Sequence, residues 1–355
     1  MPRARDIGIE IGVLPTGPTN SVLDVAGVGL GHTTLHRDEP PPPDGRGTAR
    51  TGVTVLVAAE DAYPRPLSAG GAVLNAAGEC TGFLTAREWA TLETPVYLTS
   101  TMQVGRVYDS ACRIALEQHP GVADDVVIPV VGECDDSFLN DCRRMQVEHE
   151  DVVAAHRAAL ESRGGSVAPA EGAVGAGTGM SCLGFKGGIG TSSRVTPSGH
   201  TVAVLLLTNF GERTRLTVDG VPVGRRLPPV EEPPRPAGSC IGVVVTDAPV
   251  IGADCARLAR RIGLGLARTG STAHHGSGEI FLAASTTSRT DRDGAWEDGP
   301  RVAGRALDEL FGAVVDASEE AVLNSMLTAP TTTGRDGNVS EGLDPERLEE
   351  LLRGH

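Results

Sequence analysis

The stretch PAGSCIGVVVTD, residues 236–247, joins a proline-rich polar segment to a run of apolar residues. The run at 240–247 is rich in Val and Ile and shows little alternation, which predicts a strand buried on both faces. Ser239 stands at the junction, with Gly238 before it. A serine between a loop and a strand is common and carries no function by itself. This one also occupies a position that suits a nucleophile at the start of a chain.

A hydroxyl nucleophile needs a base, and the α-amino group of the same residue can act as one because its intrinsic pKa is about 7.7–8.0. Such a residue is internal in a precursor, follows an exposed segment and begins a rigid strand. PPRPAG followed by SCIGVVVTD meets this requirement. Gly238 also lacks the Cβ that would crowd attack of the Ser239 Oγ on the preceding carbonyl. Taken alone, the pattern still favours an ordinary loop-to-strand serine.

Five more apolar runs predict buried strands, at residues 52–58, 94–100, 125–132, 200–209 and 279–285. Amphipathic patterns predict helices at 253–269, 305–327 and 344–354, with Gly270 ending the first. The elements follow no regular βαβ order, which favours stacked helix and sheet layers over a doubly wound sheet. Stretches rich in proline, glycine and charge are interpreted as surface linkers, at 36–50, 224–238 and 286–300.

Composition narrows the classes of function. The 355 residues are 40% apolar, enough for a sizeable core, and the formal net charge of −15 argues against a nucleic-acid partner. The seven cysteines include no C-x-x-C pair, which indicates free thiols rather than disulfides or a zinc site. No apolar run of about 18 residues and no signal-peptide pattern is present, so we expect a cytoplasmic protein without a membrane segment.

The glycine-rich residues 171–194 invite comparison with a phosphate-binding loop. The pattern fails because Phe185 precedes Lys186 and Gly187 follows it, where a P-loop needs Gly before the lysine and Ser or Thr after it. We interpret the segment as a glycine-dense loop packed closely against other backbone. Lys186, the only lysine in the chain, is a candidate buried ion-pair partner. The pair His274–His275 is interpreted as solvated surface.

Longer blocks of sequence carry more information than any single motif. They include GPTNSVLDVAGVGLGHTT (17–34), VVGECDDSFLND (130–141), GAGTGMSCLGFKGGIGTSSR (175–194), GSCIGVVVTDAP (238–249) and RLARRIGLGLARTGSTAHHGSGEIFLAAST (257–286). With these blocks in this order, the sequence resembles, nearly end to end, the self-processing N-terminal-nucleophile aminopeptidases. That family includes L-aminopeptidase/D-esterase and the β-peptidyl aminopeptidases.

The resemblance implies a four-layer αββα sandwich, a single α/β layered domain over residues 1–355. It implies self-cleavage between Gly238 and Ser239, giving chains 1–238 and 239–355 that stay together. The implied activity is an aminopeptidase acting on short peptides, amides or esters with a free N-terminus. The implied assembly is a homo-oligomer, commonly a tetramer, and no metal or organic cofactor is expected.

The resemblance also implies roles for individual residues. Ser239 would be the nucleophile, and the motif GSGEIF supplies Ser277, to hydrogen-bond the new amine or Oγ, and Glu279, to orient and support the ammonium. Residues two apart on an extended segment share a face, so this spacing is consistent with joint action. Asn209 would stabilise the oxyanion, or simply cap a strand. Glu133 would bind the substrate's ammonium, or form a strand-end ion pair.

Two features depart from the family pattern, and two alternatives stay open. Asp135 stands where some members carry an aromatic residue, which affects the expected shape of the pocket, and NAAGECTG (75–82) is less glycine-rich than usual. One alternative is an acyltransferase related to the ornithine acetyltransferases, although those enzymes use threonine, so Ser239 argues against it. The other is an unprocessed, inactive member.

Overall fold

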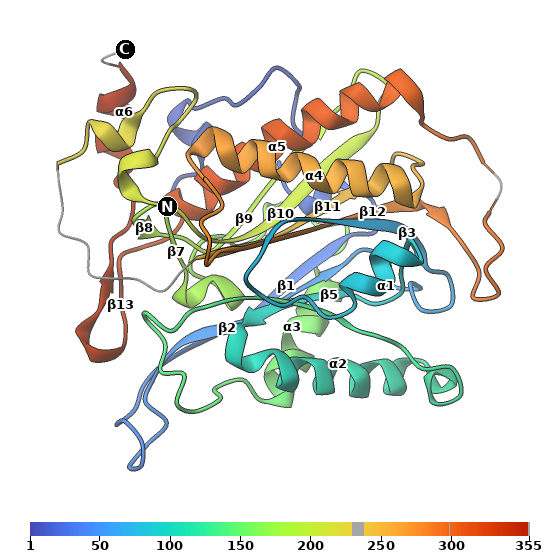
Figure 1. The fold of residues 1–355 in the computed structure, drawn as a ribbon, viewed down its shortest axis with the longest axis horizontal. Helices are drawn as coiled ribbons and strands as arrows, with labels where there is room; N and C mark the ends of the chain where they lie inside the picture. The colour runs from blue at the N-terminus through green and yellow to red at the C-terminus, as the bar shows by residue number, and fades with distance from the viewer. Residues whose placement is uncertain (229–237, 298, 354–355) are drawn as a thin grey trace.

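Two β-sheets pack face to face between two layers of helices (Figure 1). The computed structural model describes residues 1–228, 238–297 and 299–353. The first sheet has the order β1-β2-β5-β6, with β1 (Gly29–Asp38), β2 (Thr48–Val57), β5 (Val96–Ser100) and β6 (Val130–Cys134). The second has the order β4-β3-β12-β11-β10-β9, with β3 (Leu67–Ala76), β4 (Thr91–Leu92), β9 (Ile189–Val195), β10 (Thr201–Asn209), β11 (Ser239–Thr246) and β12 (Gly278–Arg289).

The helices complete the layers. Helices α2 (Val104–Gln118) and α3 (His149–Glu161) cover the first sheet, and α4 (Gly252–Thr269) and α5 (Leu307–Leu327) cover the second (Figure 1). The shorter elements are α1 (Phe83–Glu88), α6 (Pro345–Arg353) and the two-residue strands β7 (Ser181–Cys182), β8 (Phe185–Lys186), β13 (Thr332–Thr333) and β14 (Val339–Ser340). The predicted four-layer αββα sandwich is confirmed. Among the described residues no helix is long and apolar enough to cross a membrane.

Strand alternation explains the three apolar layers between the elements. In β12, Ile280 and Leu282 belong to the core between the sheets, whereas Phe281 belongs to the core under α4 and α5. In β5, Leu98 joins the inter-sheet core and Tyr97 the core under α2 and α3. Successive side chains point to opposite faces of a strand, so every central strand is apolar on both faces. This is why the predicted strands show little alternation.

Most elements predicted from the sequence are present. Strands β2, β5, β10, β11 and β12 and helices α4, α5 and α6 lie within a few residues of their predicted bounds, and Gly270 ends α4 with φ of 112°. All seven cysteines are free thiols, as predicted.

Four predictions need correction. The strand predicted at 125–132 begins only at Val130, and β9 occupies part of the predicted glycine-dense loop. Strands extend into the linkers predicted at 36–50 and 286–300.

Glycines of the glycine-dense segment, inside β9 and before it, do pack closely against backbone. A Cβ on Gly188 would lie 1.9 Å from the Gly172 carbonyl oxygen, and one on Gly190 would lie 1.9 Å from the carbonyl oxygen of Ala321 in α5. Helix α5 therefore packs directly on the backbone of β9. Most of the predicted linker 224–238 lies outside the described residues.

We expect Gly190→Ala to destabilise the fold by several kcal/mol, because its Cβ would overlap the Ala321 carbonyl in a packed layer. Gly312→Ala is the matched control: Gly312 is exposed on α5, and a Cβ there has no neighbour within 4 Å. This change should stabilise by roughly 0.5–1 kcal/mol through helix propensity. Denaturant unfolding of both variants measures the two effects. Similar stabilities for the two variants would contradict the close packing of α5 on β9.

Candidate active site

Strand pairing brings Asn209, Ser239 and Glu279 together at the ends of three interior strands of the second sheet. Ser239 is the first residue of β11 and is only 4% exposed. In the antiparallel pairing with β10 it lies opposite Asn209, and in the parallel pairing with β12 it lies opposite Gly278. Glu279 is the next residue along β12 and lies opposite Cys240. Residues spread from 209 to 279 in the sequence therefore meet where one strand ends and two begin.

Gly238 occupies a position that only glycine fits. A Cβ on it would lie 2.1 Å from the carbonyl oxygen of Asn209 and 2.7 Å from the Cα of Phe210. Its own carbonyl oxygen accepts a hydrogen bond from the Gly278 N–H at 3.3 Å. The peptide bond before Ser239 is therefore held between β10 and β12.

Ser277 and Glu279 form a buried pair on one face, as their spacing predicts. The Ser277 hydroxyl donates to Oε1 of Glu279, and both residues are buried. Burial raises the pKa of Glu279 above its usual value, opposed by the Ser277 hydrogen bond and the nearby His274. Oε2 of Glu279 is buried with no hydrogen-bond partner among the described residues. No hydrogen bond joins this pair to the Ser239 hydroxyl within the part of the chain that the structure describes.

The side-chain amide of Asn209 has a fixed orientation. Its Oδ1 accepts from the Ser181 backbone N–H at 2.9 Å, and its Nδ2 donates to the Asp135 carbonyl oxygen at 2.8 Å. A side-chain amide nitrogen carries two N–H groups. One N–H of Asn209 is therefore left without a partner among the described residues, at the position opposite Ser239. Asn209 also ends β10, so the structural and the functional interpretations are compatible.

Lys186 stabilises the turn that presents Ser181. Its fully buried Nζ donates to the carbonyl oxygens of Gly177, Met180 and Gly187 at 2.9, 2.7 and 2.7 Å. Burial lowers its pKa to about 7. In the described part of the chain its partners are carbonyl oxygens, so the expected ion pair with a carboxylate is not observed there. The lysine ties together three backbone positions next to the Ser181–Asn209 hydrogen bond.

Glu133, near the end of β6 in the first sheet, reaches the same region. Its Oε1 accepts from the Glu79 N–H at 2.7 Å, and the Thr101 hydroxyl donates to Oε2. A Cβ on Gly78 would lie 3.0 Å from Oε1 of Glu133 and 3.7 Å from the Cα of Gly278, the β12 partner of Ser239. Burial raises the pKa of Glu133. Across residues 1–228, 238–297 and 299–353 it forms no ion pair, so the alternative strand-end ion pair is not observed.

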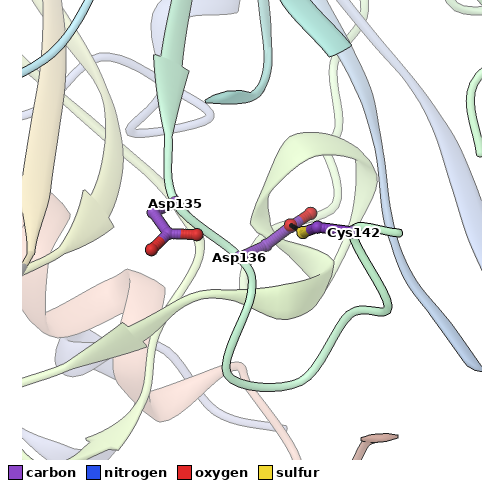
Figure 2. Close-up of side chains that lie close together, drawn as sticks. All are labelled: Asp135, Asp136 and Cys142. Carbon is purple, nitrogen blue, oxygen red and sulfur yellow. Dashed lines mark hydrogen bonds between the residues drawn. The ribbon is translucent and has the colours of Figure 1, made fainter. Parts of the chain in front are cut away.

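Asp135, Asp136 and Cys142 form a separate cluster, in which one possible ligand atom from each lies within 4.8 Å of the others. Figure 2 shows the two carboxylates pointing apart, with Asp136 directed toward Cys142. Asp135 accepts from the Ser137 N–H and hydroxyl, and Asp136 Oδ1 accepts from Asn140 and the Cys142 thiol. Burial raises the pKa of the Cys142 thiol, which keeps its proton. The three side chains therefore form a hydrogen-bonded turn with Ser137 and Asn140.

Three residues at the site had no predicted role. Thr101 directly follows β5, Ser181 acts through its backbone N–H, and Glu79 lies in the NAAGECTG segment. The position of Thr101 after a predicted strand was the one available signal. His274 is half-exposed, 3.7 Å from Glu212 Oε1, consistent with the predicted surface location.

Solved structures share this architecture. A beta-aminopeptidase from Burkholderia sp. matches with a TM-score of 0.89 at 38% identity, over 99% of each chain. An L-aminopeptidase D-Ala-esterase/amidase from Ochrobactrum anthropi matches with a TM-score of 0.89 at 35% identity, over 100% of this chain and 99% of that one. The latter is described as a prototype for the serine aminopeptidases and a variant of the Ntn-hydrolase fold. The fold described above is thus that of an N-terminal-nucleophile hydrolase.

The sequence comparison gives the same class and narrows it. The beta-peptidyl aminopeptidase BapA of Sphingosinicella xenopeptidilytica is 36% identical over 376 residues, covering 99% of this chain and 91% of that protein. The profile of peptidase family S58 matches residues 20–340. The chain belongs to peptidase family S58, and the resemblance noted from its sequence blocks is confirmed.

The buried carboxyl group of Asp136 should make the stability of the folded protein depend on pH. Burial raises its pKa from 3.8 to about 6, so its favourable contribution is complete below pH 3.8 and is lost as the pH rises through about 6. Above that, the charged form costs about 3 kcal/mol. We expect Asp136→Asn to raise the free energy of unfolding by about 2–3 kcal/mol at about pH 8 and by little at about pH 4.

Denaturant unfolding at the two pH values measures this difference. Asp135→Asn is the control, because that neighbouring carboxylate is only partly buried and accepts two hydrogen bonds from Ser137. An equal effect of Asp136→Asn at both pH values would show that the buried charge is not the cause.

Proposed function

We propose that this protein is a self-processing serine aminopeptidase that removes N-terminal residues from short peptides, amides or esters. The observation that carries the proposal is the position of Ser239 at the head of β11, between Asn209 on β10 and the Ser277–Glu279 pair at the start of β12. The names of the similar proteins, with their amide, ester and β-peptide specificities, support the same class of substrate.

The first step proposed is cleavage of the Gly238–Ser239 bond. The Ser239 Oγ attacks the Gly238 carbonyl carbon, the C–N bond breaks as the nitrogen takes a proton, and an ester remains. Water hydrolyses this ester, leaving a carboxylate on Gly238 and a free α-amine on Ser239. The narrow space beside Asn209, which excludes a Cβ at residue 238, supports this geometry.

In turnover the new α-amine takes the proton from Oγ as Oγ attacks the substrate carbonyl. The remaining N–H of Asn209 is proposed to stabilise the oxyanion, and such a donor contributes about 3 kcal/mol. The leaving amine or alcohol takes the proton, and water releases the acyl group from Ser239. Glu279 Oε2, which has no partner among the described residues, is available to accept a hydrogen bond from the ammonium.

Glu133 is proposed to bind the free ammonium of the substrate. Its carboxylate is anchored by Thr101 and the Glu79 N–H and has no basic partner in the described residues. An ammonium placed there would gain a charge-assisted hydrogen bond, which is roughly twice as strong as a neutral one. This contact would make a free N-terminus a requirement.

The protein is further proposed to be cytoplasmic and to form a homo-oligomer, expected as a tetramer. Exposed apolar side chains support association: Leu84 and Trp89 in and after α1, Leu74 at the end of β3, and Leu264 on α4. Leu74 reaches to 3.3 Å from a Cβ built on Gly263, so its side chain and α4 share one face. Grouped apolar side chains on a surface are typical of protein interfaces.

Intact-mass measurement tests self-processing. We expect wild-type protein to give two fragments, of roughly two-thirds and one-third of the 36.7 kDa chain. Ser239→Ala should give one full-length species because no Oγ is present, and Gly238→Ala should process slowly because its Cβ overlaps Asn209. Processed protein should release p-nitroaniline from aminoacyl and β-aminoacyl p-nitroanilides without an added amine acceptor. An intact, inactive wild-type protein would refute the proposal, and turnover only with an added amine would indicate an acyltransferase.

Glu133→Gln tests recognition of the substrate ammonium. We expect kcat/KM for free-amine substrates to fall about 10- to 100-fold, the loss of one charge-assisted hydrogen bond. The matched control is Glu88→Gln, an exposed carboxylate on α1. Turnover of N-acetylated substrates, which carry no ammonium, should stay low and unchanged. Unaltered kcat/KM for free amines would remove Glu133 from the binding role.

A further inference from the structure

A cavity of about 250 Å³ lies between the first sheet and helices α2 and α3. Much of its wall is apolar and includes Val57, Ala111 and Ile114. It opens near the N-terminal ends of β5 and β6, where Thr94, Pro95 and Pro129 line it. None of its lining residues takes part in the proposed reaction.

The cavity is remote from Ser239. It lies at the start of β5, whereas Thr101 and Glu133 lie past the end of β5 and near the end of β6. Seven residues of extended chain separate Thr94 from Thr101, and at about 3.3 Å each they span roughly 20 Å. Tyr97 also belongs to the core under α2 and α3, on the face of the sheet away from β11.

Two buried polar side chains, Tyr97 and His156, line this cavity, with exposures of 1% and 5%. The Gln118 Nε2 lies 2.9 Å from His156 Nε2, and the His156 Nδ1 lies 3.1 Å from the Tyr97 hydroxyl. Burial lowers the pKa of His156, so the ring is neutral and carries one N–H. The amide orientation assigned to Gln118 places its N–H on Nε2, and this assignment puts the ring proton on Nδ1, directed at the Tyr97 oxygen.

This order of donors leaves the Tyr97 hydroxyl proton without an acceptor in the described part of the chain. Burial raises the pKa of Tyr97, so the hydroxyl keeps its proton. Buried donors in proteins nearly always have a partner. With this assignment, the free O–H marks the place for an acceptor atom of a bound molecule.

The charged groups at the rim are paired. Glu93 contacts Arg292 at 2.6 Å, and Glu60 contacts Arg163 at 2.6 Å. Because both carboxylates already have an arginine partner, neither they nor their partners offer an unpaired charge to a ligand. This favours a neutral ligand. An apolar cavity of about 150 Å³ holds benzene, so this larger space suits one ring with a short substituent. At the mouth, the rings of Tyr63 and His119 stack with centroids 5.2 Å apart.

We propose that this cavity binds a small neutral ring compound bearing one hydrogen-bond acceptor, to which the Tyr97 hydroxyl donates. The site is independent of the proposed peptidase activity.

Acetophenone, ethylbenzene and benzoate form a matched set of probes: a ring with a neutral acceptor, the same ring with none, and a charged ring. Titration of the full chain, followed by calorimetry or ligand-detected NMR, should show saturable binding of acetophenone. Ethylbenzene should bind about tenfold more weakly, the loss of one hydrogen bond, and benzoate should not bind. Equal affinity for acetophenone and ethylbenzene, or no binding of either, would overturn the proposal.

Variants locate the site. Tyr97→Phe should abolish the preference for acetophenone over ethylbenzene, and Ala115→Leu, which fills the cavity, should weaken binding of both at least tenfold. Ala123→Leu makes the same change at an exposed position outside the cavity and should leave binding unaltered. Ser239→Ala should also bind acetophenone with wild-type affinity. Unchanged binding in Ala115→Leu, or lost binding in Ser239→Ala, would place the probe elsewhere and refute the assignment.

Discussion

The pairing register of β11 with its two neighbours is the constraint on which the structure depends. The ladders place Asn209, Ser239 and Gly278 side by side, and the same ladders decide which side chains face each core. Because side chains alternate with a period of two, a slip of one residue would turn the inter-sheet face of β11 toward α4 and α5. The same slip would move Ser239 away from Asn209. The apolar pattern that stabilises the fold therefore also fixes the geometry of the site.

Close backbone approach lets the outer layers rest on these strands. Glycines occupy the points of nearest contact: Gly190 under α5, Gly70 under α4, and Gly238 against β10. A Cβ on Gly70 would lie 2.4 Å from the Gly252 carbonyl oxygen in the first turn of α4. Such contacts account for part of the high glycine content of a chain with few aromatic residues. The packing is achieved by removing side chains rather than by interlocking large ones.

How far the sequence predicts this structure depends on what each element packs against. The central strands β10, β11 and β12 were predictable because both of their faces are apolar. Strand β3 was missed because glycine and alanine, which α4 requires there, have low strand propensity. Strand β9 was missed because Thr191, Ser192 and Arg194 are polar yet buried, with Arg194 paired to Glu320 at 2.7 Å. Ser239 could be suspected from its junction, whereas the roles of Asn209, Ser277 and Glu279 needed the family resemblance. The anchoring contacts of Ser181 and Thr101 depend on tertiary structure alone.

The uncut chain leaves the site electrostatically incomplete, and the proposed cleavage would complete it. In an intact chain the nitrogen of Ser239 is an amide and gives Glu279 no counter-charge, and burial raises the pKa of Glu279. Hydrolysis of the Gly238–Ser239 bond would convert that amide into an amine that can be protonated, close to the start of β12. A cation there would lower the pKa of Glu279 and favour its carboxylate. Cleavage of this one bond would therefore supply the general base and, once that amine has taken a proton, the counter-charge that stabilises the buried carboxylate.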